Sequence, residues 1–205
     1  MARNHHPKRP PDIPGLLGTL DRHGARYVLT GSVAALAYGV EIGQAGDLDI
    51  TPALNVENLT RLSAVLDEIE AGLDPDAPFG HWETRADGEK HWRVDEATPE
   101  LQAERANWRV DPADPSTFDT LVCSRLGNFD IVPELSGPYE ALMKRAVPLR
   151  AWGYAIWVVH VDELLAALTV PRRPKDTPRV RQLRELQRQR GEHQRLEAEI
   201  EREPS

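Results

Sequence analysis

Two aspartates, Asp47 and Asp49, stand two positions apart in the segment Asp47-Leu48-Asp49-Ile50-Thr51. Because the side chains of a strand alternate between its two faces, both carboxylates leave one face while Leu48 and Ile50 point into the core. Two carboxylates at one place repel each other unless a cation lies between them, and their hard oxygen atoms suit Mg²⁺ or Mn²⁺. An isolated Asp-x-Asp is more often part of a solvated strand or turn, so this pair needs support from its surroundings.

A third acid, Asp130, lies in the apolar segment Asn128-Phe129-Asp130-Ile131-Val132. An unpaired charge buried among such neighbours would be costly, which suggests that this carboxylate has a partner or a ligand. The alternative is that Asp130 points outward from a sheet with one solvated face. Together with Asp47 and Asp49 it forms the candidate metal-binding and catalytic trio.

The dipeptide Gly31-Ser32 stands where a predicted strand ends and a predicted helix begins. Helix N-termini bind phosphate through free backbone N–H groups and the positive end of the helix dipole. Glycine lets the backbone come close to a ligand, and the Ser32 hydroxyl can hydrogen-bond a phosphate oxygen. The simpler interpretation is that Ser32 only caps the helix and that Gly31 only makes the turn.

The elements that must position these residues follow from the spacing of hydrophobic residues and from turn residues. Strands are expected at residues 26–30, 47–51, 118–124, 128–132 and 156–161, and helices at residues 13–23, 33–38, 55–71, 139–146, 162–168 and 178–202. Asn55 is the expected N-cap of the clearest helix. Two short segments around the Asp87-Gly88 turn predict a hairpin.

The composition is that of an ordinary globular protein, with 205 residues of which 40% are hydrophobic and 28% charged. No apolar run is long enough to span a bilayer, and no apolar core follows the N-terminal residues as in a secretory signal, so we expect a cytoplasmic protein without a membrane partner. The net charge of −8 argues against broad electrostatic contact with nucleic acid, although a basic segment spans Arg172 to Arg190. The single cysteine, Cys123, excludes an internal disulfide and a Cys-rich zinc site.

Three segments are expected along the chain. Residues 1–14 contain four of the 17 prolines and predict a flexible N-terminal arm. Residues 15–170 form the predicted main domain, with a polar excursion at residues 74–116. Residues 171–205 predict a helical C-terminal tail that is first basic and then acidic. That tail could contact an RNA backbone, or it could be a partner helix or a disordered segment.

The order of motifs along the chain resembles that of the polymerase beta-like nucleotidyltransferases, in particular the stand-alone AbiEii-type toxins and their relatives. The resemblance extends over about residues 26–180. The motifs that carry it are, in chain order, Thr30-Gly31-Ser32, Ala35-Leu36-Ala37-Tyr38-Gly39, Asp47-Leu48-Asp49-Ile50, Gly127-Asn128-Phe129-Asp130-Ile131-Val132, Tyr139-Glu140-Ala141-Leu142, Arg145-Ala146, Asp162-Glu163-Leu164-Leu165 and Arg173-Pro174-Lys175-Asp176.

This resemblance implies an α+β nucleotidyltransferase fold, in which helices flank a mixed β-sheet and a helical extension follows at the C-terminus. It implies that the aspartate pair binds the Mg²⁺ (or Mn²⁺) of a nucleoside triphosphate, and that Asp130 holds a second metal or takes the proton of the acceptor hydroxyl. Gly31 and Ser32 would hold the terminal phosphates, and Lys175 would add a positive charge. The implied activity is transfer of a nucleoside monophosphate to an acceptor hydroxyl. Toxin relatives imply tRNA as the acceptor and a cognate antitoxin protein as a partner.

The chain departs from the family pattern at two places. Family members often place an Arg and a Thr before the first aspartate, where this chain has Gly43-Gln44-Ala45-Gly46. They often carry a lysine where this chain has Leu168. The alternative function is therefore a catalytically impaired module on the same fold, which binds a nucleotide or a protein without turnover.

Overall fold

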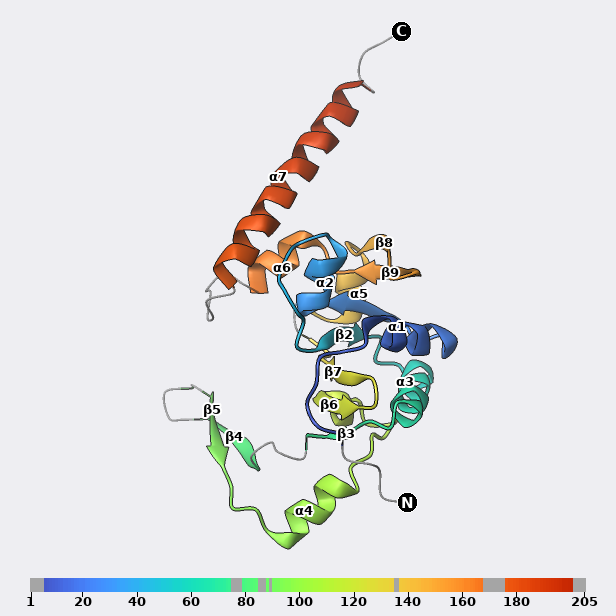
Figure 1. The fold of residues 1–205 in the computed structure, drawn as a ribbon, viewed down its shortest axis with the longest axis vertical. Coiled ribbons are helices and arrows are strands. Elements are labelled where there is room, and N and C mark those ends of the chain that lie inside the picture. The colour runs from blue at the N-terminus through green and yellow to red at the C-terminus, as the bar shows by residue number, and fades with distance from the viewer. Residues whose placement is uncertain are drawn as a thin grey trace.

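Asp49 and Asp130 lie on neighbouring strands of one mixed, seven-stranded sheet (Figure 1). The computed structural model describes residues 6–74, 79–84, 88, 90–134, 137–167 and 176–200. The strands of the sheet stand in the order β3-β6-β7-β2-β1-β9-β8. Their bounds are β1 Tyr27–Thr30, β2 Leu48–Pro52, β3 Gly72–Leu73, β6 Thr120–Ser124, β7 Gly127–Ile131, β8 Val147–Ala151 and β9 Tyr154–Val158.

Seven α-helices accompany this sheet in the part of the chain that the structure describes. They are α1 Ile13–Arg22, α2 Gly31–Ala37, α3 Val56–Glu68, α4 Pro99–Ala106, α5 Tyr139–Met143, α6 Val161–Ala167 and α7 Asp176–Ile200. The expected α+β class with a mixed sheet and flanking helices is therefore confirmed. None of these helices has both the length and the apolar character needed to cross a membrane.

The register of the three central strands brings the site residues together. β1 runs antiparallel to β2, so that Thr30 lies opposite Asp49. β2 runs parallel to β7, so that Asp49 lies opposite Asp130. Helix α2 follows β1 without a loop, because it begins at Gly31 directly after Thr30. The end of β1, the start of α2 and the middle of β2 and β7 therefore meet at one place.

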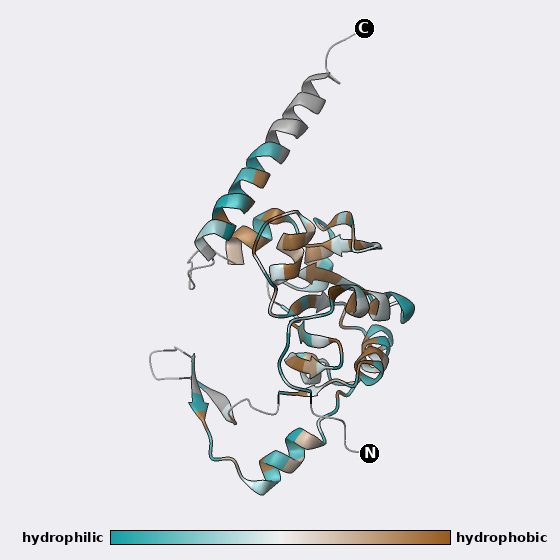
Figure 2. Cartoon of the chain, viewed as in Figure 1, coloured by the Kyte–Doolittle hydropathy of each residue, from teal (hydrophilic) through white to brown (hydrophobic). Residues whose placement is uncertain are grey.

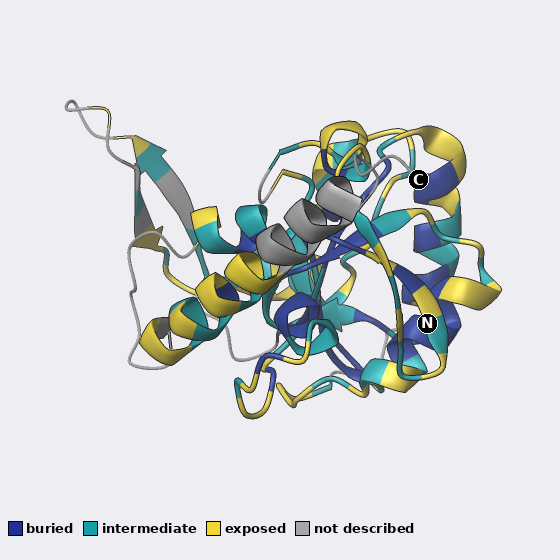
Figure 3. Ribbon diagram, turned by 90° about the horizontal axis from the view of Figure 1, so that it is seen from above, coloured by how far each residue is buried: buried dark blue, intermediate teal, exposed yellow. Residues whose placement is uncertain are grey.

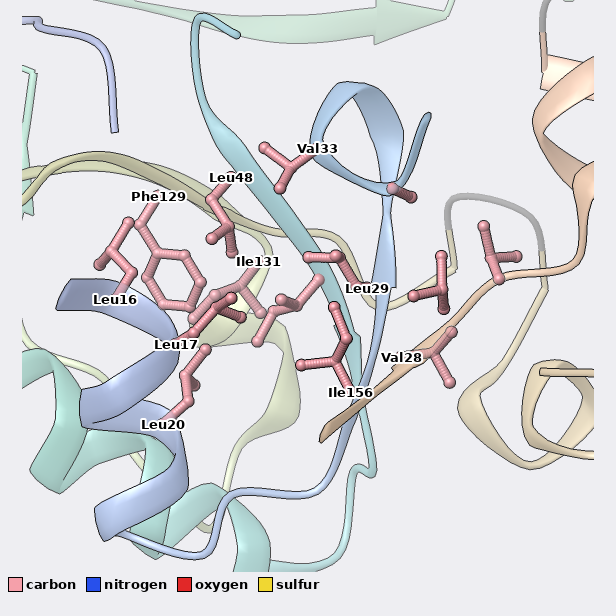
Figure 4. Close-up of a cluster of buried hydrophobic side chains, with 14 of the residues drawn as sticks. Leu16, Leu17, Leu20, Val28, Leu29, Val33, Leu48, Phe129, Ile131 and Ile156 are labelled. Carbon is pink, nitrogen blue, oxygen red and sulfur yellow. The ribbon is translucent and has the colours of Figure 1, made fainter. Parts of the chain in front are cut away.

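The other face of the same strands is held by hydrophobic packing. Leu48, Ile50, Phe129 and Ile131 are fully buried, as their alternation with the two aspartates predicts. In Figure 4 the leucines of α1 point toward Phe129, Ile131 and their neighbours, whereas Val28 points to the opposite side of the sheet. This packing fixes which face of β2 and β7 carries the aspartates, because a slip of one residue would exchange the two faces.

Hydrophobic residues are gathered in the sheet and in the helices beside it, whereas α7 is largely hydrophilic (Figure 2). Figure 3 shows the buried residues concentrated in the same central layers. We expected an exposed helix over residues 178–202. The helix instead begins at Asp176 and buries the side chain of Leu183 completely, so its first turns are packed against the body of the protein.

The described part of the N-terminal arm, residues 6–12, runs beside the turn between β6 and β7. Arg9 and Asn128 are joined twice: the Arg9 N–H donates to the Asn128 side-chain oxygen at 3.1 Å, and the Asn128 N–H donates to the Arg9 carbonyl at 3.0 Å. The Asp12 N–H donates to the Leu126 carbonyl at 2.7 Å. These backbone contacts connect the arm to the strand that carries Asp130.

Several expected elements differ in their bounds or were missed. The expected hairpin in the excursion is confirmed as β4 Gly80–Thr84 and β5 Lys90–Val94, which pair antiparallel. α4 was missed because none of its residues is buried and its sequence lacks an apolar stripe. β8 was missed because it is an edge strand without a buried residue. β2 ends at Pro52, which lies opposite Tyr27.

Asn58 connects helix α3 to the two strands that lead to the site. Its side-chain oxygen accepts the N–H of Arg26 at 2.6 Å, and its amide nitrogen donates to the carbonyls of Arg26 and Ala53 at 2.9 and 2.8 Å. Arg26 precedes β1 and Ala53 follows β2, so one buried amide joins both strands. The expected N-cap of α3 is also confirmed, since the Asn55 side chain accepts the Asn58 N–H at 3.1 Å.

We predict that Asn58→Ala lowers the free energy of unfolding by about 2–4 kcal/mol, because it removes three hydrogen bonds to the backbone and leaves the buried Ala53 carbonyl without the Asn58 donor. The matched control is Asn107→Ala, which removes one hydrogen bond, from Asn107 to the Ala103 carbonyl, at an exposed position. Its expected loss is below about 1 kcal/mol. Urea unfolding of both variants measures the difference. Equal losses would show that Asn58 does not have this joining role.

Candidate functional site

The candidate site is built on the carboxylate pair of Asp49 and Asp130. They are register partners on adjacent parallel strands, and adjacent strands lie about 4.8 Å apart. Side chains at paired positions leave the same face of a sheet, so the two carboxylates are neighbours. Both residues are half-buried, while the residues on either side of each are buried on the opposite face. The arrangement is a close acidic pair on a partly accessible face.

Gly31 makes the closest approach to this pair. Its backbone has a φ of +62°, a conformation that L side chains rarely adopt. A Cβ atom at this position would overlap the Asp49 carboxylate and lie 2.9 Å from the Asp49 Cβ. The backbone N–H of Ser32 also donates a hydrogen bond to Asp49. Glycine is therefore required here for two reasons, the left-handed backbone and the space that the Asp49 side chain occupies.

This hydrogen bond bears on the expectation that the Gly31-Ser32 turn binds phosphate with its free N–H groups. The Ser32 N–H is already used by the Asp49 carboxylate. The Ser32 hydroxyl, in contrast, is buried and has no hydrogen-bond partner among the described residues, and the same holds for the hydroxyl of Thr30. Buried hydroxyl groups are seldom left unpaired. These two hydroxyls, on either side of Gly31, are available to a ligand.

The acidic pair strongly perturbs its own ionisation. The pKa of Asp49 is raised from 3.8 to about 7, first by burial and then by the negative charges of Asp47 and Asp130. The Ser32 N–H and the positive charge of Arg179 lower this pKa, but less than the other effects raise it. The pKa of Asp130 is raised to about 6 by burial and by the charges of Asp47 and Asp119. A pair of this kind is stabilised by a shared proton or by a cation.

Asp47 lies one residue before β2, not within it as expected. Its charge acts on both other carboxylates. Its position is set by Asn128, whose side-chain nitrogen donates to the Gly46 carbonyl at 2.9 Å. The three expected acids thus interact electrostatically around one point, with Asp49 and Asp130 paired directly and Asp47 attached through the preceding loop.

Carboxylate oxygen atoms are the ligands that Mg²⁺ and Mn²⁺ prefer. Burial and, to a smaller extent, neighbouring negative charges raise both pKa values, and a divalent cation would stabilise the charged forms of both carboxylates. By donor chemistry, Asp49, Asp130 and Asp47 fit such an ion. Within the described ranges, however, no three His, Cys, Asp or Glu side chains are arranged as a group that could hold a metal ion. Metal binding by this trio therefore stays a prediction.

Arg179 is the functional candidate that the sequence did not reveal. It lies in the first turns of α7, is half-buried, and its charge acts on Asp49. Lys175, the positive residue expected at the site, lies outside the described residues, as does Leu168. Arg179 is one of many arginines in the basic segment, so spacing alone gave no signal that this one faces the carboxylates. Leu183, an apolar residue four positions after Arg179, was the sequence feature that indicated which side of this helix is buried.

We predict that Gly31→Ala destabilises the protein more than Gly39→Ala does. Both glycines have positive φ, of +62° and +81°, but a Cβ at residue 39 would meet nothing within 4 Å. Gly39→Ala should therefore show only the backbone cost of about 1–2 kcal/mol. Gly31→Ala should cost at least about 1 kcal/mol more, because it displaces the Asp49 side chain.

The double variant Gly31→Ala with Asp49→Ala is the internal check on this assignment. Removing the Asp49 carboxylate removes the overlap, so the double-mutant cycle should return most of the excess loss. Thermal and urea unfolding of the four proteins give the coupling free energy. A coupling near zero would mean that Gly31 is needed only for its backbone conformation.

We predict that Asp49→Asn stabilises the metal-free protein at high pH. The folded-state pKa of Asp49 is raised to about 7, so its contribution to stability is fully present below about pH 4 and is lost as the pH rises through 7. The variant lacks this loss, and its amide oxygen can still accept the Ser32 N–H. We expect a gain of at least about 1 kcal/mol at pH 8 that shrinks toward pH 5.

Thermal unfolding in the presence of EDTA, at pH 5 to 8, measures this difference. Glu96→Gln, which neutralises one exposed carboxylate outside the helices and strands, is the control, and its effect should not change across this range. A gain for Asp49→Asn that is the same at pH 5 and pH 8 would contradict the assigned burial of charge.

The site was also compared with known proteins. No family model, no curated protein and no solved structure matches the chain. The chemistry of the site therefore follows from the geometry of its own residues.

Proposed function

We propose that the protein is a magnesium-dependent nucleotidyltransferase that moves a nucleoside monophosphate from a nucleoside triphosphate to an acceptor hydroxyl. The observation that carries this proposal is the in-register pair of Asp49 and Asp130, with Asp47 beside it and the Gly31 turn pressed against it. The β1–α2–β2 arrangement and the parallel pairing of β2 with β7 fit the nucleotidyltransferase fold that the motif order resembles.

The three aspartates would act as ligands of the divalent cation that accompanies the triphosphate. Such an ion, when bound, neutralises negative charge on the phosphates and stabilises the oxygen atoms of an in-line displacement. Repulsion among the carboxylates supports this assignment, since nothing in a purely structural role requires three acids around one half-buried point. Asp47 and Asp49 are assigned to the nucleotide side, and Asp130 to the acceptor side.

In the reaction, the acceptor oxygen forms a bond to the α-phosphorus, and the bond between that phosphorus and the bridging oxygen to the β-phosphate breaks. Pyrophosphate leaves, and the proton of the acceptor hydroxyl passes to Asp130. The Ser32 hydroxyl, which lacks a partner in the described part of the chain, is placed to donate to a phosphate oxygen.

For the acceptor we propose the 3′ end of a tRNA in the cytoplasm, with a cognate antitoxin protein as the natural inhibitor. This choice rests on the resemblance to toxin-type nucleotidyltransferases and on the arginines of α7. The exposed residues of its first half include Arg181 and Arg184, which supply positive charge on α7 despite the net charge of −8.

We predict that the protein transfers label from at least one α-labelled nucleoside triphosphate to total tRNA in the presence of Mg²⁺. Asp49→Asn and Asp130→Asn should each reduce the rate by about 100-fold or more, because each removes charge from the reacting centre. Asp21→Asn, which neutralises an exposed carboxylate of α1, should leave the rate unchanged. Gel separation of the labelled products measures the transfer.

Two results would reject this function. Transfer that survives Asp49→Asn would mean that another site or a contaminant does the chemistry. Tight binding of nucleotide without transfer to tRNA, to protein or to small hydroxyl compounds would favour the alternative, a module that binds a nucleotide without turnover. EDTA should abolish transfer and excess Mg²⁺ should restore it.

A further inference from the structure

Helix α7 presents one face to the body of the protein. Arg179, Leu183 and Leu186 are spaced i, i+4 and i+7 and therefore share a side of the helix. Leu183 is fully buried and Leu186 packs against the hydrophobic core, so this side faces inward. Arg181 and Arg184 are exposed and lie on the outer side. Arg179 is thus the inward-facing arginine of the first turns that the structure describes.

Two sets of hydrogen bonds hold this face in place. The Glu41 N–H donates to the Gln182 side-chain oxygen at 2.7 Å, and the Gln182 amide nitrogen donates back to the Glu41 carbonyl at 3.3 Å. Further along, Gln187 donates to Asp162 at 2.5 Å, and Asp162 is ion-paired with Arg145 at 2.6 Å. α7 is therefore attached to the glycine-rich loop before Asp47 and to helix α6.

Arg179 carries a buried donor that has no partner within the described ranges of the chain. Its Nε atom is buried and makes no hydrogen bond to the described residues, and no ion pair joins it to a carboxylate within them. Arg179 lies three residues before Gln182, which joins α7 to the loop preceding Asp47, and on the same helix side as the buried Leu183, so its side chain is directed toward this part of the protein. A buried donor of a charged group without an acceptor is costly, so this arrangement calls for an anionic ligand.

We propose that Arg179 binds the β- and γ-phosphates of the nucleoside triphosphate, and that α7, attached to the loop before Asp47, forms one wall of the site. This inference rests on the proposed function and adds a residue to it. Phosphates cannot approach Asp49 and Asp130 unless cations compensate the repulsion, and a planar guanidinium group matches phosphate oxygen atoms in two parallel hydrogen bonds. The unpaired hydroxyls of Thr30 and Ser32 supply donors on the other side.

This assignment moves the expected positive charge from Lys175 to Arg179. It also gives the C-terminal segment a function in the reaction in addition to any contact with an acceptor or a partner. A nucleotide would be enclosed between α7 and the strands, so the segments 29–51 and 179–187 act on the same ligand although they are far apart in sequence.

The test is calorimetric binding of α,β-methylene nucleoside triphosphates, which cannot transfer their nucleotide, in the presence of Mg²⁺. The four bases are tried on the wild-type protein, and the best ligand is compared with its nucleoside. Arg179→Ala should weaken binding of the triphosphate by about 10- to 100-fold and leave binding of the nucleoside unchanged. Arg179→Lys should recover part of the loss, since it keeps the charge but not the paired donors.

Arg150→Ala is the matched control, because it removes the same charge from an exposed position on the edge strand β8, outside α7. It should bind the triphosphate as the wild-type protein does. In the transfer assay, Arg179→Ala should raise KM for the triphosphate, whereas Arg150→Ala should not.

Each other outcome has a distinct meaning. If the wild-type protein binds a triphosphate and Arg179→Ala binds it equally well, this inference is wrong while the proposed function stands. If Arg179→Ala loses triphosphate and nucleoside together and its melting temperature falls, Arg179 only supports the packing of α7, and the inference is again wrong. If the wild-type protein binds none of the four triphosphates, the proposed function itself is rejected, and this inference with it.

Discussion

The repulsion between two half-buried carboxylates, Asp49 and Asp130, is the constraint on which the rest of the site depends. Their strands are neighbours and their positions are in register, so neither side chain can avoid the other without breaking the sheet. Burial adds to the repulsion, since it disfavours the charged form of both groups. The Gly31 turn, the Ser32 N–H and Arg179 all surround Asp49, the group with the higher pKa. Each of them restricts the movement of the Asp49 carboxylate or lowers the free-energy cost of its negative charge.

The opposite face of the same strands makes this unfavourable pair tolerable. Four fully buried side chains, Leu48, Ile50, Phe129 and Ile131, stabilise the register by roughly 1.5–3 kcal/mol each. The raised pKa values, by about 3 units for Asp49 and about 2 for Asp130, correspond to roughly 7 kcal/mol for the pair when both carboxylates are charged. The hydrophobic burial of the four side chains is of the same order, so it can offset the cost of holding the carboxylates together. The free-energy cost of the two charged carboxylates destabilises the folded protein unless a proton or a cation is bound to them.

The sequence was sufficient to predict the centre of the fold because every signal there is local. Alternation in Asp47-Leu48-Asp49-Ile50 assigns the faces of β2, and Asn55 marks the start of α3, as its hydrogen bond shows. Arg179 could not be identified, because its place depends on the docking of α7 through Leu183 and on contacts to a loop 141 positions away in sequence. The strand pairing that makes Asp49 and Asp130 neighbours is equally nonlocal. The two expected contributors Lys175 and Leu168 fall outside the described residues.

Most of the groups that could take part in chemistry come from the strands, but the positive charge comes from a helix that is attached separately. Asp49 and Asp130 are fixed by the sheet, whereas Arg179 lies on a helix that is held by Leu183 and Leu186, by Gln182 on the Glu41 backbone and by the hydrogen bond from Gln187 to Asp162. A helix that is held by so few contacts opens more easily than a strand within a sheet does. Movement of α7 would therefore remove the positive charge while the carboxylates stay in place. The site would then repel phosphate, so under the proposed function the docking of this helix, rather than the acids, would decide whether a nucleotide binds.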